Sequence, residues 1–192
     1  MKRVYIIAGC NGAGKTTATF TILPEFINCS EFVNADEIAQ GLSPLQPDTM
    51  AFEAGKLMIR RMNWLFSQNK SFAIETTLAT RRYINFIKKL RLSGYRISLL
   101  FFWLNSKELA LKRVTTRVDE GGHNIPENVV RRRYELGLSY FFNQYKQRVD
   151  DWILLDNSIN PYKMIAREGN KKLEIFDMVI WKRLRSKYEK SR

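Results

Sequence analysis

The sequence predicts an α/β fold, in which helices cover both faces of a doubly wound parallel sheet. Short apolar runs alternate with segments of helical periodicity, which is typical of strand–helix–strand units with right-handed crossovers. The segment 95–104 is an apolar run of the kind found in strands buried on both faces. Polar side chains follow the apolar runs at the point where a parallel sheet binds its ligands.

The predicted elements follow in a regular order. Apolar runs predict strands at residues 3–8, 31–33, 71–75, 95–104 and 152–155, the last of which we expect to end the sheet. Helical spacing and capping residues predict helices at 15–23 (before Pro24), 48–68 (after Pro47), 81–92, 106–118 and 127–148. A small hairpin at 163–176 and a basic helix at 178–190 complete the chain.

The first strand leads into Gly-Cys-Asn-Gly-Ala-Gly-Lys-Thr at residues 9–16, a complete G-x-x-x-x-G-K-[ST] motif. Because this loop joins a buried strand to a helix, its backbone N–H groups point at the phosphates of a nucleotide. Lys15 is expected to reach the β- and γ-phosphates, and the Thr16 hydroxyl to bind Mg²⁺. We therefore predict ATP and Mg²⁺ as cofactors. The residues expected to bind ATP are Gly9, Cys10, Asn11, Gly12, Ala13, Gly14, Lys15, Thr16 and Thr17.

Composition narrows the class of protein. The chain has 192 residues, of which 45% are hydrophobic, and it contains no run of about 18 apolar residues that could span a membrane. Because the N-terminus leads straight into the first strand, we expect no signal peptide. We expect its two cysteines, Cys10 and Cys29, to be reduced thiols. These observations predict a cytoplasmic protein.

The net charge of +13 is concentrated in residues 79–146 and 163–192. Such a charge favours polyanions, namely nucleotides, sugar nucleotides, RNA or an acidic protein. For the end of the chain, residues 182–192, a solvated basic face explains the composition about as well.

Asp36 follows the second strand and is the best candidate for a general base that takes a proton from a substrate hydroxyl. It could instead cap the short helix that begins there, or lie in the second shell of Mg²⁺. Glu75 ends an apolar strand, where a charge needs a ligand or a buried arginine as partner. Thr76 and Thr77 either donate to substrate oxygens or are turn residues. With Asp36, the predicted substrate-binding residues are Glu75, Thr76, Thr77 and Arg81.

Several arginines could neutralise charge on a transferred phosphoryl group. Arg113 and Arg117 are four residues apart and share one helix face. Of Arg131, Arg132 and Arg133, which splay around a helix, we expect the first two to face the pocket and the third to be solvated. Residues 120–124 form a mobile lid in this interpretation, and the single histidine, His123, is a surface or hydrogen-bonding residue rather than a catalyst. The predicted catalytic residues are Lys15, Asp36, Arg113, Arg117 and Arg131.

Taken together, these residues resemble the zeta toxin family of P-loop kinases, in particular its chromosomal branch. The resemblance covers residues 2–160 and rests on residues 8–17, 32–39, 75–78, 121–126 and 156–158. It implies a kinase-like P-loop NTPase fold with a helical lid, and an ATP-dependent enzyme that phosphorylates the 3′-hydroxyl of the amino sugar in UDP-N-acetylglucosamine. It also implies either a separate antitoxin as partner or no antitoxin at all.

The same resemblance assigns roles to individual residues. Asp36 would be the base, Lys15 the phosphate-binding lysine, and Arg113 a transition-state arginine. Glu75 and Thr77 would contact the sugar nucleotide. A second arginine of the family's lid corresponds to the neighbourhood of His123, so that either Arg117 or Arg131 would replace it or the activity would differ.

Two other functions remain open from the sequence. A nucleoside or polynucleotide kinase would suit the net charge of +13, although no interleaving of aromatic and basic residues suggests a platform for stacking bases. A non-enzymatic ATP-binding switch is the third hypothesis, which the acidic residues at two strand ends disfavour. We predict a kinase domain at residues 1–160, and a C-terminal hairpin and basic helix at 161–192 that pack on it or extend it.

Overall fold

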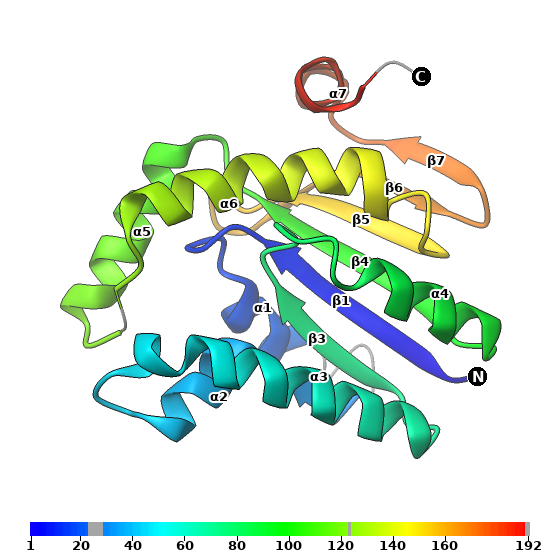
Figure 1. The fold of residues 1–192 in the computed structure, drawn as a ribbon. Helices are drawn as coiled ribbons and strands as arrows, with labels where there is room; N and C mark the ends of the chain where they lie inside the picture. Colours follow the sequence, from blue (N-terminus) through cyan, green and yellow to red (C-terminus); the bar gives the residue numbers. More distant parts are fainter. Residues whose placement is uncertain (23–28, 123, 191–192) are drawn as a thin grey trace.

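The computed structural model describes residues 1–22, 29–122 and 124–190, and its centre is a single seven-stranded sheet (Figure 1). The strand order is β2-β3-β1-β4-β5-β6-β7; the first five run parallel, and the last two are antiparallel. The strands span Arg3–Gly9 (β1), Phe32–Val33 (β2), Phe72–Thr76 (β3), Arg96–Trp103 (β4), Asp151–Asp156 (β5), Lys163–Gly169 (β6) and Lys172–Ile175 (β7).

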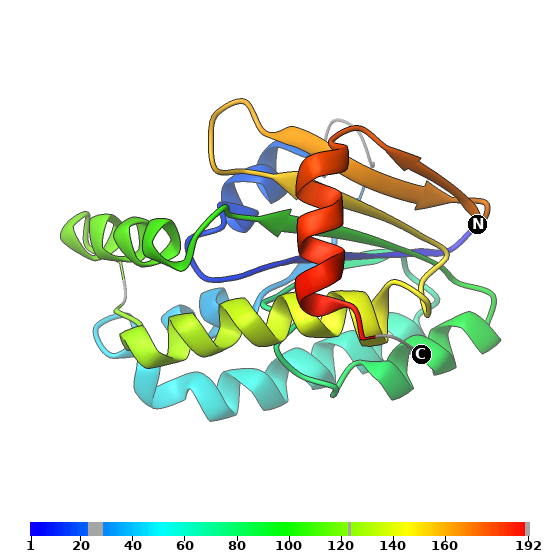
Figure 2. The ribbon, with the colours of Figure 1, turned by 90° about the horizontal axis from the view of Figure 1, so that it is seen from above.

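Helices lie on both sides of this sheet. Figure 2 shows α3, α4 and α6 on one side and α1 on the other. The helices span Lys15–Ile22 (α1), Ala35–Leu42 (α2), Ala51–Ser67 (α3), Ile84–Leu92 (α4), Lys107–Asp119 (α5), Glu127–Tyr140 (α6) and Met178–Tyr188 (α7); a 3₁₀ turn, Pro47–Met50 (η2), precedes α3, and a π-helical turn, Phe141–Tyr145 (η3), follows α6. The doubly wound α/β class predicted from the sequence is confirmed.

The sequence predicts that β5 ends the sheet, but two further strands follow it. Strand β6 pairs antiparallel with β5 over its whole length, and β7 pairs with β6. Leu154 of β5 and its partner Ala166 are completely buried, so the hairpin covers a strand that would otherwise be an open apolar edge. We propose on this basis that residues 161–192 extend the domain formed by residues 1–160.

Two helix boundaries also differ from prediction. Helix α4 begins at Ile84 rather than residue 81, so that a longer loop follows β3. The predicted helix at 127–148 is an α-helix only to Tyr140 and continues as the π-helical turn η3. The predicted end of the first helix at Pro24 lies outside the described residues.

Aromatic side chains join the C-terminal helix to the core. Trp181 of α7 stacks on Trp152 of β5 at a centroid distance of 5.6 Å, and Phe141 meets Trp152 edge-on at 5.4 Å. Each of these rings is almost completely buried. Helix α7 is therefore part of the hydrophobic core, although much of its outer face is basic. Within the described residues, no helix has the length and apolar character needed to cross a membrane.

We expect Trp181→Ala to lower the free energy of unfolding by about 3–5 kcal/mol, because it removes a stacked ring that the fold cannot replace. Urea denaturation followed by circular dichroism measures this change. Val179→Ala on the same helix is the matched control, since the Val179 side chain is 79% exposed. Equal stability of the two variants would contradict the role of α7 in the core.

Candidate active site

The phosphate-binding loop lies at the carboxyl end of β1 and is held by close backbone contacts. A Cβ on Gly9 would lie 2.4 Å from the carbonyl oxygen of Phe102, and one on Gly12 would lie 2.7 Å from that of Ala110. Both glycines have positive φ angles, +148° and +76°. Because only glycine fits these positions, the loop can approach both β4 and the start of α5.

The other end of the loop is braced by Asn157, which follows β5. Its side-chain amide donates a hydrogen bond of 2.8 Å to the carbonyl oxygen of Ala13. A Cβ on Gly14, whose φ is +75°, would lie 2.5 Å from the same amide nitrogen. Asn157 thus fixes the loop just before Lys15, where the sequence had indicated only a polar residue after a strand.

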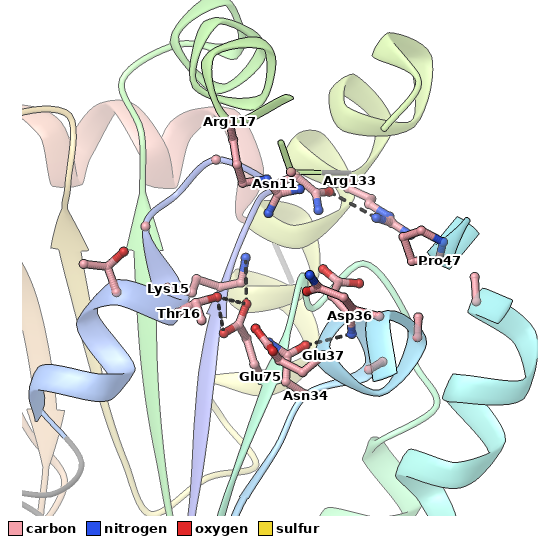
Figure 3. Close-up of a pocket in the computed structure, with 18 of the residues that line it drawn as sticks. Asn11, Lys15, Thr16, Asn34, Asp36, Glu37, Pro47, Glu75, Arg117 and Arg133 are labelled. Carbon is pink, nitrogen blue, oxygen red and sulfur yellow. Dashed lines mark hydrogen bonds and ion pairs between the residues drawn. The ribbon is translucent and has the colours of Figure 1, made fainter. Parts of the chain in front are cut away.

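Lys15 and Glu75 form a buried ion pair at the floor of the site. The Lys15 Nζ lies 3.6 Å from Glu75 Oε1 and donates a hydrogen bond of 2.9 Å to the carbonyl oxygen of Cys10. The Thr16 hydroxyl donates to the Glu75 carboxylate, at 2.9 Å from Oε2. The partner of Glu75 is therefore the phosphate-loop lysine rather than an arginine (Figure 3).

The thiol of Cys10, which belongs to the phosphate-binding loop, is also buried, and this burial raises its pKa to about 11. Cys10 is therefore a neutral thiol at physiological pH and adds no negative charge where phosphates would bind. Among the described residues, the structure contains no cluster of three or more His, Cys, Asp or Glu side chains suited to a metal ion.

The cleft above this floor has two adjoining lobes. The P-loop lobe, of about 460 Å³, is lined by the phosphate-binding loop, α2, η2 and α5. The threonine lobe, of about 440 Å³, is lined by Thr76, Thr77 and Thr80 after β3 and by residues of α6. Six residues border both lobes: Lys15, Asn34, Ala35, Asp36, Glu75 and Arg133.

Asp36 lies in the first turn of α2, on the wall that faces Lys15 and Glu75 (Figure 3). It is not the cap of this helix. Asn34 occupies that position, and its side-chain oxygen accepts a hydrogen bond of 2.9 Å from the Asp36 N–H. The Asp36 carboxylate is thus not used in capping and borders both lobes.

Arg113 and Arg117 line the P-loop lobe from α5, so the structure brings them together with Lys15, Thr16 and Asp36. The Arg113 guanidinium donates to the carbonyl oxygen of Ser158, at 3.1 Å. Figure 3 shows Arg117 above the phosphate-binding loop. His123, at the predicted lid, lies outside the described residues.

Arg133, not Arg131, reaches the cleft from α6, and here the prediction needs correction. Arg131 pairs with Glu127, one turn earlier on the helix, and with Glu108 of α5, and it lines neither lobe. The Arg133 guanidinium donates a hydrogen bond of 3.1 Å to Asn11 of the phosphate-binding loop. Burial lowers the pKa of Arg133, and the negative charge of Asp36 acts in the opposite direction.

A signal for this difference was present in the sequence. Glu127 and Arg131 have the i, i+4 spacing of a surface ion pair. Arg133 instead lies three residues after the buried Val130 and four before the buried Gly137, so it borders the apolar face of α6.

A second correction concerns Arg81: Arg82, not Arg81, lines the threonine lobe. Arg132 of α6 lines the same lobe, as the sequence predicts. Arg81 is exposed, and its guanidinium lies over the ring of Tyr140. Because α4 begins at Ile84, three residues later than predicted, residues 81–83 are not helical and their side chains point in directions that a helix would not give them. Thr76 and Thr77 line the lobe as expected.

A family comparison agrees with this arrangement. The model of the zeta toxin family matches residues 1–157. This chain belongs to the zeta toxin family. Its P-loop cleft is accordingly that of a phosphotransferase. An uncharacterized protein of Haemophilus influenzae is 29% identical over 132 residues, which cover 69% of this chain and 92% of that protein.

Solved structures similar to this zeta toxin family member share its fold at low identity. A chain of the AvrRxo1-ORF1:AvrRxo1-ORF2 complex with sulphate ions is 17% identical, with a TM-score of 0.73; the match covers 96% of our chain but only 63% of that one. A chain from the PezAT chromosomal toxin–antitoxin system of Streptococcus pneumoniae is 17% identical, with a TM-score of 0.68 and coverages of 100% and 81%. A sugar kinase from Janibacter sp. HTCC2649 is 19% identical, with a TM-score of 0.54 and coverages of 84% and 88%.

We expect Asn157→Ala to weaken ATP binding about fivefold, because the Ala13 carbonyl loses its donor and the phosphate-binding loop loses a brace. Isothermal titration calorimetry with ATP measures the effect. Asn63→Ala is the matched control: the Asn63 amide also donates to a backbone carbonyl, that of Ile59, but on the exposed face of α3. Equal affinities in both variants would contradict the bracing role.

Arg133→Gln should lower kcat by about 100-fold or more, because it removes a cation that borders both lobes. Arg131→Gln on the same helix should leave kcat within about twofold, since an exposed ion pair contributes little. Steady-state kinetics with saturating ATP compares the two variants. The opposite order of effects would restore Arg131 as the catalytic arginine.

Proposed function

We propose that this phosphotransferase is an ATP-dependent kinase that transfers the γ-phosphate of ATP to a hydroxyl of a nucleotide-sugar such as UDP-N-acetylglucosamine. The observation that carries the proposal is the position of Asp36. Its carboxylate borders a lobe built around the phosphate-binding loop and a second lobe built from hydroxyl and guanidinium groups. A base between donor and acceptor is what phosphoryl transfer to an alcohol requires.

On the donor side, the loop N–H groups and Lys15 would hold the β- and γ-phosphates of ATP. Arg113, Arg117 and Arg133 line the same lobe and would neutralise charge that develops on the transferred group. The Lys15 ammonium contacts the Glu75 carboxylate and the Cys10 carbonyl oxygen at the floor of this lobe.

The donor set near Thr16 suits Mg²⁺, which prefers hydroxyl, carboxylate, water and phosphate oxygens. The Thr16 hydroxyl already contacts the Glu75 carboxylate, so two such groups adjoin. They would hold a Mg²⁺ ion that arrives with ATP, as is usual for sites with few protein ligands. When bound, the ion would neutralise charge on the β- and γ-phosphates.

On the acceptor side, the chemistry of the threonine lobe favours an anionic, hydroxyl-rich substrate. Arg82 and Arg132 form no ion pair with any carboxylate in the part of the chain that the structure describes. Together with Arg133 they suit the phosphates of a nucleotide-sugar, which arginine binds in a bidentate manner. Thr76, Thr77 and Thr80 offer hydrogen bonds to its sugar hydroxyls.

In the reaction we propose, Asp36 accepts the proton of the attacking sugar hydroxyl as its oxygen bonds to the γ-phosphorus. The bond from the γ-phosphorus to the bridging oxygen breaks, and ADP leaves.

A separate antitoxin protein is the partner we propose. The AvrRxo1 structure contains two proteins, ORF1 and ORF2, and the PezAT structure comes from a toxin–antitoxin system. We propose that the antitoxin covers the same target as ATP, namely the P-loop lobe, whose lining includes the basic side chains Lys15, Arg113, Arg117 and Arg133. A partner that inserts an acidic segment there would compete with the nucleotide.

We expect Asp36→Asn to lower the rate of phosphoryl transfer by about 100-fold or more, because the amide cannot accept the proton, while ATP affinity is retained. The protein is incubated with Mg²⁺-ATP and UDP-sugars, nucleosides or short RNAs, and mass spectrometry detects a phosphorylated product. Asp119→Asn, the same change at an exposed residue of α5, is the matched control.

Phosphorylation of a UDP-sugar that is lost only in Asp36→Asn would support the proposal. Phosphate on nucleosides or RNA alone would identify the enzyme as a nucleoside or polynucleotide kinase. Full activity in Asp36→Asn would exclude Asp36 as the base.

A further inference from the structure

The loop that follows β3 has an unusual backbone for the residues it contains. Leu78 has a φ of +59°, a conformation that L-amino acids with large side chains rarely adopt, and its side chain is completely buried. Its N–H donates a hydrogen bond of 3.0 Å to the Thr76 hydroxyl oxygen. Strained residues of this kind persist when their surroundings fix them, and they occur often at ligand sites. The neighbouring residues Thr76, Thr77 and Thr80 line the threonine lobe.

Helix α6 provides the surroundings that fix this loop. Gly137 lies directly against it, and a Cβ at this position would be 2.7 Å from the carbonyl oxygen of Thr77. The clashing atom belongs to the backbone, so it cannot move aside as the end of a flexible side chain would. Gly137 is therefore needed for close approach, although glycine is a poor helix former and the position is inside a helix.

A second contact comes from the π-helical turn that continues α6. The hydroxyl of Tyr145 donates to the carbonyl oxygen of Thr80, and the Tyr145 side chain is completely buried. The wider turn changes the direction in which side chains leave the helix, and such turns are frequent near functional sites. Thr77 and Thr80, at the two ends of the loop segment, are thus each held by one residue from the same continuous helix.

The same helix also lines the lobe. Arg132 and Arg133 of α6 border it about one turn before Gly137, and Leu136 borders it directly before Gly137. The distance between the arginines and the threonines is consequently set by how closely α6 approaches the loop. We infer that Gly137 and Tyr145 are acceptor-positioning residues, which fix the width of the threonine lobe for the phosphate acceptor. This inference rests on the proposed function of that lobe.

The test separates binding of the acceptor from binding of ATP. Gly137→Ala adds one methyl group against the Thr77 carbonyl while favouring the helix itself, so the loop must shift. We expect kcat/KM for UDP-N-acetylglucosamine to fall about tenfold, since small misplacements of a reacting group are costly, with the ATP dissociation constant unchanged. Gly41→Ala is the matched control, because a Cβ there meets nothing within 4 Å.

Tyr145→Phe provides a second variant that changes no volume. It removes only the donor to Thr80, and we expect kcat/KM for the acceptor to fall about fivefold, again without effect on ATP binding. Tyr162→Phe is its control, because Tyr162 is half exposed and lies away from the lobe. Thermal denaturation verifies that each variant is folded. If Gly137→Ala does not fold, Tyr145→Phe alone tests the inference.

Unchanged acceptor kinetics in Tyr145→Phe and in folded Gly137→Ala would refute the inference and leave the proposed function intact. An equal loss of ATP and acceptor binding would also refute it, because that pattern indicates a general structural role. Absence of transfer to any acceptor by the unmodified protein would refute the proposed function, and this inference with it.

Discussion

The buried ion pair of Lys15 and Glu75 is the constraint on which the rest of the site depends. Their side chains are 7% and 6% exposed, so each charge needs the other or a ligand in its place. The parallel register of β1 and β3 places Glu75 beside Ile7, close to the phosphate-binding loop that follows β1 and leads to Lys15. The phosphate-binding loop, the cleft floor and the wall bearing Asp36 are all arranged around this pair (Figure 3).

Helix α6 contacts both the phosphate-binding loop and the loop after β3, and so joins the two lobes of the cleft. Its Arg133 contacts Asn11 of the phosphate-binding loop, and its Gly137 packs against the loop after β3. These two contacts lie about one helical turn apart, so a rigid helix fixes both lobes at once. The position of α6 is therefore a property of the active site as much as of the fold.

The C-terminal region stabilises that position through aromatic packing. Phe141, at the end of α6, contacts Phe101 of β4 at 5.0 Å and Trp152 of β5 at 5.4 Å. Trp181 of α7 stacks on Trp152. Rings of this size contribute strongly to a hydrophobic core. The antiparallel hairpin and α7 thus secure the end of the helix that bears the cleft arginines.

The sequence by itself determined the parallel core and the phosphate-binding loop, because apolar strands and closely spaced glycines are local patterns. It also placed Asp36 and Glu75 at strand ends, where topology alone brings polar groups to one edge of a sheet. Only the tertiary structure decided between Arg131 and Arg133, since this depends on which face of α6 meets the loop. It also decided that α4 begins three residues late, because the strained loop before it is held by residues distant in sequence, Gly137 and Tyr145.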